Sequence, residues 1–324
     1  MAFSWPEVSV VIPHYNDEVS LARVVDAVRA QDYAGAVEIV VADDGSERLP
    51  QIPGVRLVRQ EDAGFRAAAA RNLGAAAAGG EVLAFLDADT IPEPGYLSAV
   101  VPHIMGDERA VVVGTRLTGA AREEPQWLRD AWERTDHLRT ADHTSWRYII
   151  SAVLSCSTAF FESVGGFDGS FVGYGGEDWE FGWRAWNSGA TFVHEPDAVA
   201  VHPEEDFGGR FTDPAEAVRV KNAETLALAR RISHPLARPE HVLFADYDIA
   251  VTVPPLDGEG VMEFVISEWV KIGAYVQVAQ VPDLFTADPR VGSAEVPARV
   301  SVAIGAGWAP QDLDALLACE YVLC

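Results

Sequence analysis

Short apolar runs alternate with helical patterns along the first third of the chain. Buried-strand patterns cover residues 8–12, 37–41, 55–58, 82–86 and 111–113. Between them, Leu21, Val24, Val25 and Val28 recur at helical spacing, and an alanine-rich helical pattern covers residues 65–78. Strands that are apolar throughout and alternate with helices predict an α/β fold, in which helices cover both faces of a mostly parallel sheet.

Polar residues follow these apolar runs. Tyr15, Asp43, Asp44, Asp87 and Asp89 each stand just after a predicted strand. Ligands of open α/β sheets bind beyond the carboxyl ends of the strands. We therefore expect these side chains to meet at one edge of the sheet and to form a binding site there.

The second half of the chain is less regular. Residues 117–148 contain many charges and no clean strand, and such insertions are often substrate-binding loops or small helical subdomains. Strand patterns return at 190–193 and 198–201, and a helical pattern covers 214–232. Pro235 and Pro239 then indicate a boundary. We predict one domain over residues 1–238 and a second over 239–324.

The predicted C-terminal domain is a small α/β unit. Strand patterns cover 248–253, 275–281 and 299–304, and helical patterns cover 260–272 and 311–317. The chain ends inside an apolar run, which indicates either a shortened sequence or a final buried strand. This unit carries no motif from which a role can be predicted.

Composition narrows the classes of function. The formal net charge is −25, and hydrophobic residues make up 49% of 324 residues. Such a charge disfavours nucleic acid and anionic membranes as partners, because both need positive potential. It also slightly favours a neutral or cationic ligand over a polyanion, while leaving room for a local basic pocket.

The cysteines and the termini add little chemistry. Cys156, Cys319 and Cys324 are too few and too irregularly spaced for a disulfide framework or a zinc cluster. The N-terminal segment lacks the pattern of a signal peptide, and no run of apolar residues is long enough to span a bilayer. We expect a cytoplasmic protein without a transmembrane segment.

Three separated polar sites suggest one metal-dependent centre. Asp87 and Asp89 offer two carboxylates after a buried strand, and Mg²⁺ or Mn²⁺ shares such oxygens with substrate phosphates. A solvated turn explains a D-x-D equally well. His202 follows an apolar run and offers an imidazole, although a structural histidine is the commoner case and His194 is a competing candidate.

The segment GGFDGSFVGYGGEDWEFGWRAW, residues 165–186, is the most informative. It places Glu177 and Asp178 after a glycine-rich loop, where a helix begins. A carboxylate there can act as a general base toward an incoming hydroxyl, or it can simply favour the first turn of the helix. Glu180 lies further into the helix and is expected to be structural.

Two further segments suggest a nucleotide site. Tyr15 can stack on a base and Asp43 or Asp44 can accept its N–H, although turn chemistry alone explains these residues as well. Gly64 precedes a helix that carries Arg66 and Arg71. These arginines could face a pyrophosphate at the helix N-terminus or lie solvated on the helix surface.

Together these segments resemble the nucleotide-sugar glycosyltransferases of family 2, which have the GT-A fold. VSVVIPHYND, VADDGS, ARNLGAA and VLAFLDAD are similar in order and spacing to that family's first half. The segment 165–186 with VAVHP resembles the galactosyltransferase-type second half of chondroitin-polymerase-like enzymes, β-1,4-galactosyltransferases and polypeptide N-acetylgalactosaminyltransferases. The likeness covers roughly residues 7–232.

The resemblance implies a role for each candidate residue. It implies a nucleobase site, most often for uracil, at Pro13, Tyr15, Asp43 and Asp44. Asp87, Asp89 and His202 would form the site for Mn²⁺ or Mg²⁺, with Asp89 on the ion and Asp87 nearer the ribose. Asp178 would be the catalytic base and Glu177 a sugar contact. Retaining relatives carry Asn where this chain has Asp178, so the resemblance favours inversion.

The expected activity is therefore metal-dependent transfer of a sugar from a nucleotide donor, with UDP as the expected nucleotide, to the hydroxyl of a carbohydrate or small-molecule acceptor. Two alternatives compete. A non-catalytic sugar-nucleotide-binding protein would not need the complete acidic and imidazole set. A nucleotidyltransferase usually opens with a glycine-rich basic loop, and PHYND has neither glycine nor lysine. Of Trp127, Trp132 and Trp146 we expect two in the core, and the third could stack on a sugar.

Overall fold

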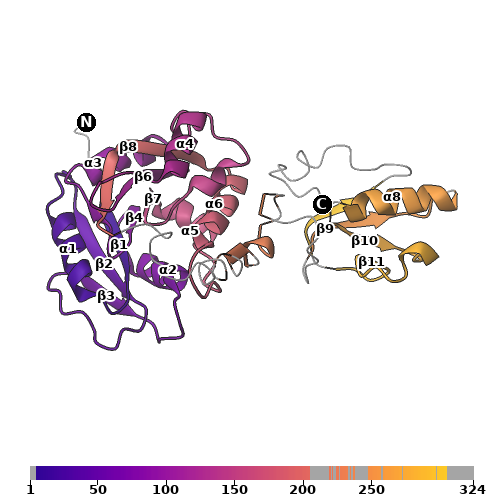
Figure 1. The fold of residues 1–324 in the computed structure, drawn as a ribbon, viewed down its shortest axis with the longest axis horizontal. Helices are drawn as coiled ribbons and strands as arrows, with labels where there is room; N and C mark the ends of the chain where they lie inside the picture. Colours follow the sequence, from indigo (N-terminus) through magenta and orange to yellow (C-terminus); the bar gives the residue numbers. More distant parts are fainter. Residues whose placement is uncertain are drawn as a thin grey trace. The chain divides into compact units, whose positions relative to one another are not determined.

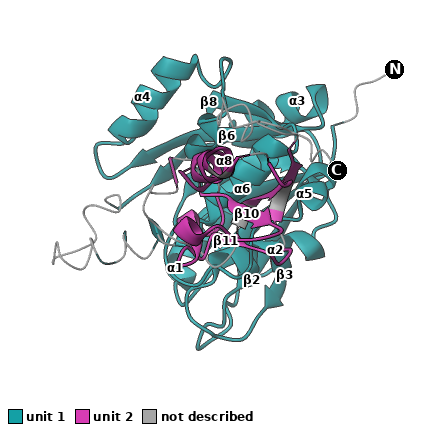
Figure 2. Cartoon of the chain, turned by 90° about the vertical axis from the view of Figure 1, so that its right-hand side faces the viewer, with its two compact units in different colours: residues 1–227 teal, residues 228–324 magenta. Residues whose placement is uncertain are grey.

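The structure is a computed structural model of the 324-residue chain. It describes residues 5–204, 219, 221, 224–225, 227–232, 234, 236–237, 247–256, 258–271, 273–296 and 298–304. The chain separates into two compact units, residues 1–227 and 228–324 (Figure 2). The domain boundary that the sequence predicts after residue 238 stays a prediction.

The first unit is built on an eight-stranded mixed sheet (Figure 1). Its spatial order is β3 (Arg56–Arg59), β2 (Val37–Asp43), β1 (Val8–His14), β4 (Val82–Leu86), β7 (Val153–Ser157), β6 (Ala110–Thr118), β8 (Thr191–His202) and β5 (Ile91–Pro92). β3, β2, β1 and β4 run parallel, as do β6 and β8. β7 lies antiparallel between β4 and β6. The predicted α/β fold is confirmed, and β7 makes the sheet mixed.

The helices of this unit follow the strands along the chain. They are α1 (Glu18–Arg29), α2 (Ala67–Ala77), α3 (Tyr96–Gly106), α4 (Gln126–Thr135), the 3₁₀ turn η1 (Ser145–Tyr148), α5 (Thr158–Val164) and α6 (Glu177–Asn187). In α1 the buried residues are those of the predicted helical spacing, and the Asp17 carboxylate caps the Ser20 amide. Described residues between 219 and 229 are helical, within the range where the sequence predicts a helix.

Four phenylalanines join the strand that leads to Asp87 with the helix that carries Asp178. The Phe85 ring on β4 packs against the rings of Phe161 and Phe167, with centroids 5.1 and 5.4 Å away. Phe167 in turn packs at 4.9 Å against Phe181 on α6. Burial of several aromatic rings is a strong cohesive contribution. This cluster therefore fixes α6 relative to the end of β4.

Several sequence expectations are corrected in this unit. The sequence patterns missed α3, β7 and α5. The two strands expected at 190–193 and 198–201 form one strand, β8, whose pairing with β6 shifts register after Gly114. The region 117–148 contains α4 and η1, which agrees with a small helical insertion. Among the described residues, no helix has the length and apolar character that crossing a bilayer demands.

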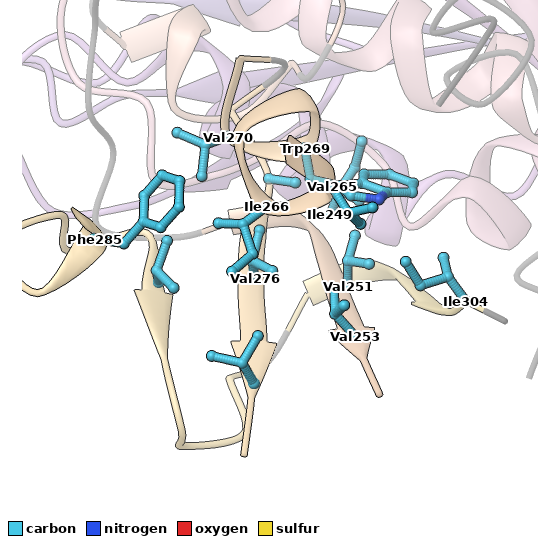
Figure 3. Packing of buried hydrophobic residues seen from close by; sticks show 13 residues of the cluster. Ile249, Val251, Val253, Val265, Ile266, Trp269, Val270, Val276, Phe285 and Ile304 are labelled. Carbon is cyan, nitrogen blue, oxygen red and sulfur yellow. The ribbon is translucent and has the colours of Figure 1, made fainter. Parts of the chain in front are cut away.

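The second unit contains a four-stranded parallel sheet with the order β11 (Val291–Gly292), β10 (Tyr275–Val278), β9 (Tyr247–Val253), β12 (Ala298–Ala303). In chain order this is 3-2-1-4, the arrangement of one half of a doubly wound sheet. Helix α8 (Glu259–Lys271) packs Val265, Ile266 and Trp269 into its core, and a 3₁₀ turn η3 (Asp283–Phe285) adds Phe285 (Figure 3). The predicted α/β character is confirmed here. Residues 311–317 lie outside the described residues.

Glycine at position 182 determines how closely α6 packs. A Cβ atom there would lie 2.7 Å from the Trp146 backbone carbonyl. Gly182→Ala should therefore lower the free energy of unfolding by about 1–3 kcal/mol, the usual effect of overpacking, even though alanine is the better helix former. Urea unfolding measures this effect.

Gly106→Ala is the matched control, because Gly106 is also helical and a Cβ atom added to it would meet nothing within 4 Å. We expect this substitution to leave stability unchanged or slightly higher. Equal effects of the two substitutions would contradict close packing of α6 on η1.

Candidate active site

The candidate residues gather at one edge of the large sheet. β2, β1 and β4 are neighbours and parallel, so their carboxyl ends lie side by side. Asp43 ends β2, Tyr15 follows β1 and Asp87 follows β4. The sheet topology therefore brings together motifs that are more than 70 residues apart in the sequence.

Asp43 is a structural residue at this edge. Its side chain has no exposed surface, and its Oδ1 atom lies 3.1 Å from Nδ1 of the buried His14. Its Oδ2 atom accepts the Ser46 amide at 3.1 Å and lies 3.5 Å from Arg59 Nε. A carboxylate enclosed in this way cannot meet a base without reorganisation. Asp43 therefore supports the loop structure at this edge, where the resemblance implied a contact with the nucleobase.

Tyr15 and Asp44 remain the residues best placed for a nucleobase. Tyr15 is 46% exposed and donates from its hydroxyl to Asp62 at 3.2 Å. Asp44 accepts the Arg66 backbone amide at 2.7 Å and lies 3.8 Å from Arg66 Nε. Pro13 is a half-buried residue near the end of β1. Gly64 has a φ of 87° in the turn before α2.

Arg71 is the central cation of the site and is not solvated. The residue is 3% exposed. Its Nη2 atom donates to Asp87 Oδ1 at 2.6 Å, and its Nη1 atom donates to Glu177 Oε1 at 3.0 Å. The guanidinium carbon lies 5.6 Å from the centroid of the Phe167 ring. Burial alone would lower the pKa of the guanidinium, but the carboxylates of Asp87 and Glu177 raise it above its ordinary value. This arginine links the end of β4 to the start of α6.

Asp89 and His202 form a second pair beside this bridge. Asp89 Oδ2 lies 3.1 Å from His202 Nε2, and His202 Nδ1 lies 2.9 Å from the Glu204 carbonyl. A carbonyl accepts only a protonated nitrogen, so Nδ1 carries hydrogen and Nε2 faces Asp89. Burial alone would lower the pKa of His202, but Asp89 raises it overall. The competing His194 instead stacks on Trp132, with ring centroids 4.0 Å apart.

This pair fits a divalent cation. An octahedral metal with ligands at about 2.1 Å places adjacent ligand atoms about 3 Å apart, and the two atoms are 3.1 Å apart. The Glu204 carbonyl orients His202 as carbonyls orient metal-binding imidazoles. Asp87 is bound by Arg71 instead, and the described residues contain no group of three or more His, Cys, Asp or Glu side chains arranged for a metal. The protein would supply two ligands, leaving the rest to the substrate.

Asp178 stands at the start of α6. Gly176, with a φ of 96°, is the N-cap, and the Asp178 carboxylate accepts the Trp179 amide at 2.9 Å. Burial and the charge of Glu177 raise the pKa of Asp178 to about 7, and Arg71 and the Trp179 amide oppose the rise. Glu180 is structural as expected, because it pairs with Arg184 on the same helix. A carboxyl that titrates near neutrality suits a general base.

A cavity of about 420 Å³ contains these groups. Asp87, Arg71, Glu177 and Asp178 all line it. Asp87 of the DAD motif and the GGED segment thus face one space of the size that holds a small ligand, whereas Asp89 and His202 are not among the residues that line it.

The cavity also has walls that the sequence did not single out as site residues. They include Phe65, Arg116, Tyr174, Trp179, Lys221 and Glu224. Trp127 lines the cavity and is 43% exposed, whereas Trp132 and Trp146 are buried. The expectation of two core tryptophans is confirmed. Periodicity does not identify the other residues as site residues, because they come from separate loops, helices and one strand that only the fold brings together.

Comparison with known proteins identifies the class. A family model described as glycosyl transferase family 2 matches residues 9–164, and one described as the N-terminal domain of galactosyltransferase matches residues 139–202. Together the two models cover residues 9–202, and both describe sugar transferases. Residues 9–164 are thus similar to glycosyl transferase family 2, and the resemblance noted in the sequence is confirmed.

Curated relatives include chondroitin synthase of Escherichia coli, 26% identical over 275 residues, which cover 72% of this chain and 40% of the relative. Validoxylamine A glucosyltransferase of Streptomyces hygroscopicus subsp. limoneus is 33% identical over 219 residues, covering 55% and 48%. The chain thus spans less than half the length of these two relatives.

Solved structures show the same GT-A fold. TarS of S. aureus in complex with UDP-GlcNAc has a TM-score of 0.51 at 16% identity, covering 69% of this chain and 67% of that one. GalNAc-T7 with UDP, GalNAc and Mn²⁺ has a TM-score of 0.51 at 19% identity, covering 72% and 52%. At these identities the likeness shows the fold alone.

Arg71 provides a test of the site's electrostatics. Arg71→Met should lower the free energy of unfolding by about 3–5 kcal/mol, because it leaves two carboxylates without their cation in a largely buried place. Arg71→Lys should retain part of this stability. Urea unfolding at pH 7 measures both.

Arg139→Met is the control, because Arg139 pairs with Asp136 on the surface with both side chains more than half exposed. Its effect should stay below about 1 kcal/mol. If Arg71→Met proved as mild as this control, the bridge would contribute little to the fold.

Proposed function

We propose that this enzyme transfers a sugar from a UDP-linked donor to an acceptor hydroxyl with inversion of configuration. The observation that carries the proposal is the single cavity lined by both Asp87 and Asp178. UDP as the nucleotide is supported by TarS and GalNAc-T7, which share the fold and were solved with UDP-GlcNAc and with UDP and GalNAc. Inversion is supported by Asp178, since retaining relatives of the galactosyltransferase type carry Asn at the matching place.

The donor lies over the edge formed by β1, β2 and β4. Tyr15 stacks on the base, and Asp44 accepts a base N–H while its other hydrogen bonds keep it fixed. Asp87 faces the ribose, with its carboxylate held by Arg71. Glu177, held by the same arginine, accepts a hydroxyl of the transferred sugar. Groups held in advance in this way lower the cost of orienting the reactants.

Asp178 is the base of the reaction. Its carboxylate takes the proton of the acceptor hydroxyl while the hydroxyl oxygen forms a bond to the anomeric carbon. On the opposite side the bond from that carbon to the diphosphate oxygen breaks, and UDP leaves with the electron pair. An α-linked donor therefore gives a β-glycoside.

Asp89 and His202 would hold Mn²⁺ or Mg²⁺ at this site. The bound ion stabilises negative charge on the leaving diphosphate. The chain's own part is to fix the two ligands, and the Glu204 carbonyl does so for His202.

Asp178→Asn tests the base. It should leave the UDP affinity nearly unchanged and reduce kcat at least about 100-fold, the lower range for a lost general base. In the native enzyme kcat/KM should rise with pH through an apparent pKa near 7, because the acid form of Asp178 cannot accept a proton. This limb should vanish from the residual activity of the variant.

The rate is measured as UDP release with a matched sugar acceptor, and UDP binding by calorimetry is the control for folding. A variant that keeps near-normal turnover would exclude Asp178 as the base. A fall in activity accompanied by lost UDP binding would instead indicate damage to the fold.

Asp89→Ala tests the metal pair. With Mn²⁺ present, its affinity for UDP should fall at least about tenfold, the scale on which lost metal-site groups act. With EDTA the variant and the native protein should bind UDP equally, because the residual contacts do not involve the ion. Unchanged affinity in Mn²⁺ would argue against a cation at Asp89 and His202.

A further inference from the structure

One wall of the cavity is aromatic and exposed. We call Phe65, Trp127, Tyr174, Trp179, Lys221 and Glu224 the acceptor wall; all of them line the cavity together with Asp178. Trp127 and Tyr174 are 43% and 41% exposed, and the Tyr174 ring lies 6.3 Å from that of Phe65. Exposed rings beside a base form flat surfaces on which a sugar-like ring, or a cation, can rest.

The same wall is negatively charged close to the base. The Glu224 side chain is 9% exposed and approaches the loop so closely that a Cβ on Gly175 would lie 2.9 Å from its carboxyl carbon. Lys221 pairs with it at 2.7 Å but is 53% exposed, so solvent screens much of that positive charge. Glu224 therefore places a third carboxylate beside residues 175–178, next to Glu177 and Asp178.

Four carboxylates and three cations, Arg71, Arg116 and Lys221, line the cavity, which leaves a formal excess of one negative charge. Glu177, Asp178 and Glu224 line this part of the cavity, and the buried cation Arg71 is shared between Glu177 and Asp87. Burial is the main cause that raises the pKa of Asp178, the charges of Glu177 and, more weakly, Glu224 add to it, and Arg71 opposes it. A uronic acid would be repelled there, and a positive group would be attracted.

We propose that the acceptor is an amine-bearing polyhydroxylated ring, an amino sugar or aminocyclitol, whose ammonium lies between Glu224 and the aromatic side chains of the acceptor wall. This inference rests on the proposed function and names its acceptor class. The ammonium has no lone pair, so a neighbouring hydroxyl is the nucleophile and gives its proton to Asp178. The ammonium itself takes no part in bond formation.

The arrangement couples acceptor binding to the base. An ammonium beside Glu224 offsets the charge of that carboxylate, the smallest of the causes that raise the pKa of Asp178. The carboxylate would then ionise more readily when an acceptor is bound than when the cavity holds water. Hydrolysis of the donor by water is correspondingly disfavoured.

Binding of matched monosaccharides tests the proposal. The methyl glycosides of glucosamine, N-acetylglucosamine and glucuronic acid are titrated at pH 7 into the full chain with UDP and Mn²⁺, and tryptophan fluorescence reports binding near Trp127. The glucosamine glycoside should bind at least about tenfold more tightly than the other two, as a partly desolvated cation contact allows. Glu224→Gln should abolish this preference.

Glu133→Gln is the matched control, since Glu133 is an exposed residue of α4 outside the cavity and its loss changes the net charge equally. It should retain the preference. Equal binding of the three glycosides, binding of none, or a preference that survives Glu224→Gln would overturn the proposal. The UDP affinity of the same samples distinguishes failure of the acceptor class from failure of the proposed function. If UDP still binds but the preference is absent, only the acceptor class is refuted. If UDP does not bind, the proposed function is refuted as well.

Discussion

A buried guanidinium holds the two halves of this active site together. Arg71 neutralises Asp87 at the end of β4 and Glu177 at the start of α6, and the Phe167 ring packs beneath it. Without this cation, three carboxylates including Asp178 would repel one another in a place that water reaches poorly. A buried charge pair is not a stabilising device in general, because its desolvation offsets the attraction. Here the bridge matters for position: it fixes the carboxylate of Asp87 relative to that of Glu177, the neighbour of Asp178.

The packing around this bridge also fixes the positions of the site residues. The phenylalanine cluster ties β4 to α6, and the close approach of Gly182 to η1 leaves α6 little freedom to shift. The contacts among Asp43, His14 and Ser46 hold together the two loops that carry Tyr15 and Asp44. The candidate side chains are thus held in place by packed or hydrogen-bonded neighbours. Positioning of this kind suits a reaction whose geometry must be held closely.

The sequence predicts the parallel part of the sheet well, because β1, β2 and β4 are apolar throughout and end in polar residues. It fails at β7, whose serines are fully or nearly buried yet resemble loop residues, and at α3, which is apolar on most faces and contains Pro102. The D-x-D, the Glu177–Asp178 pair and His202 were found because each follows an apolar run or a glycine-rich loop. Glu224 and Trp127 were not identified as site residues, because only tertiary folding brings them to the cavity.

Glu224 lies outside the segments that the two family models match, which end at residue 202. Asp87, Glu177 and Asp178 lie inside them. The residues for which we propose a part in the reaction and the residue that approaches Gly175 are therefore encoded separately along the chain. Natural variation could alter which molecule is glycosylated by replacing a few residues near position 224, while the inherited chemistry stays untouched.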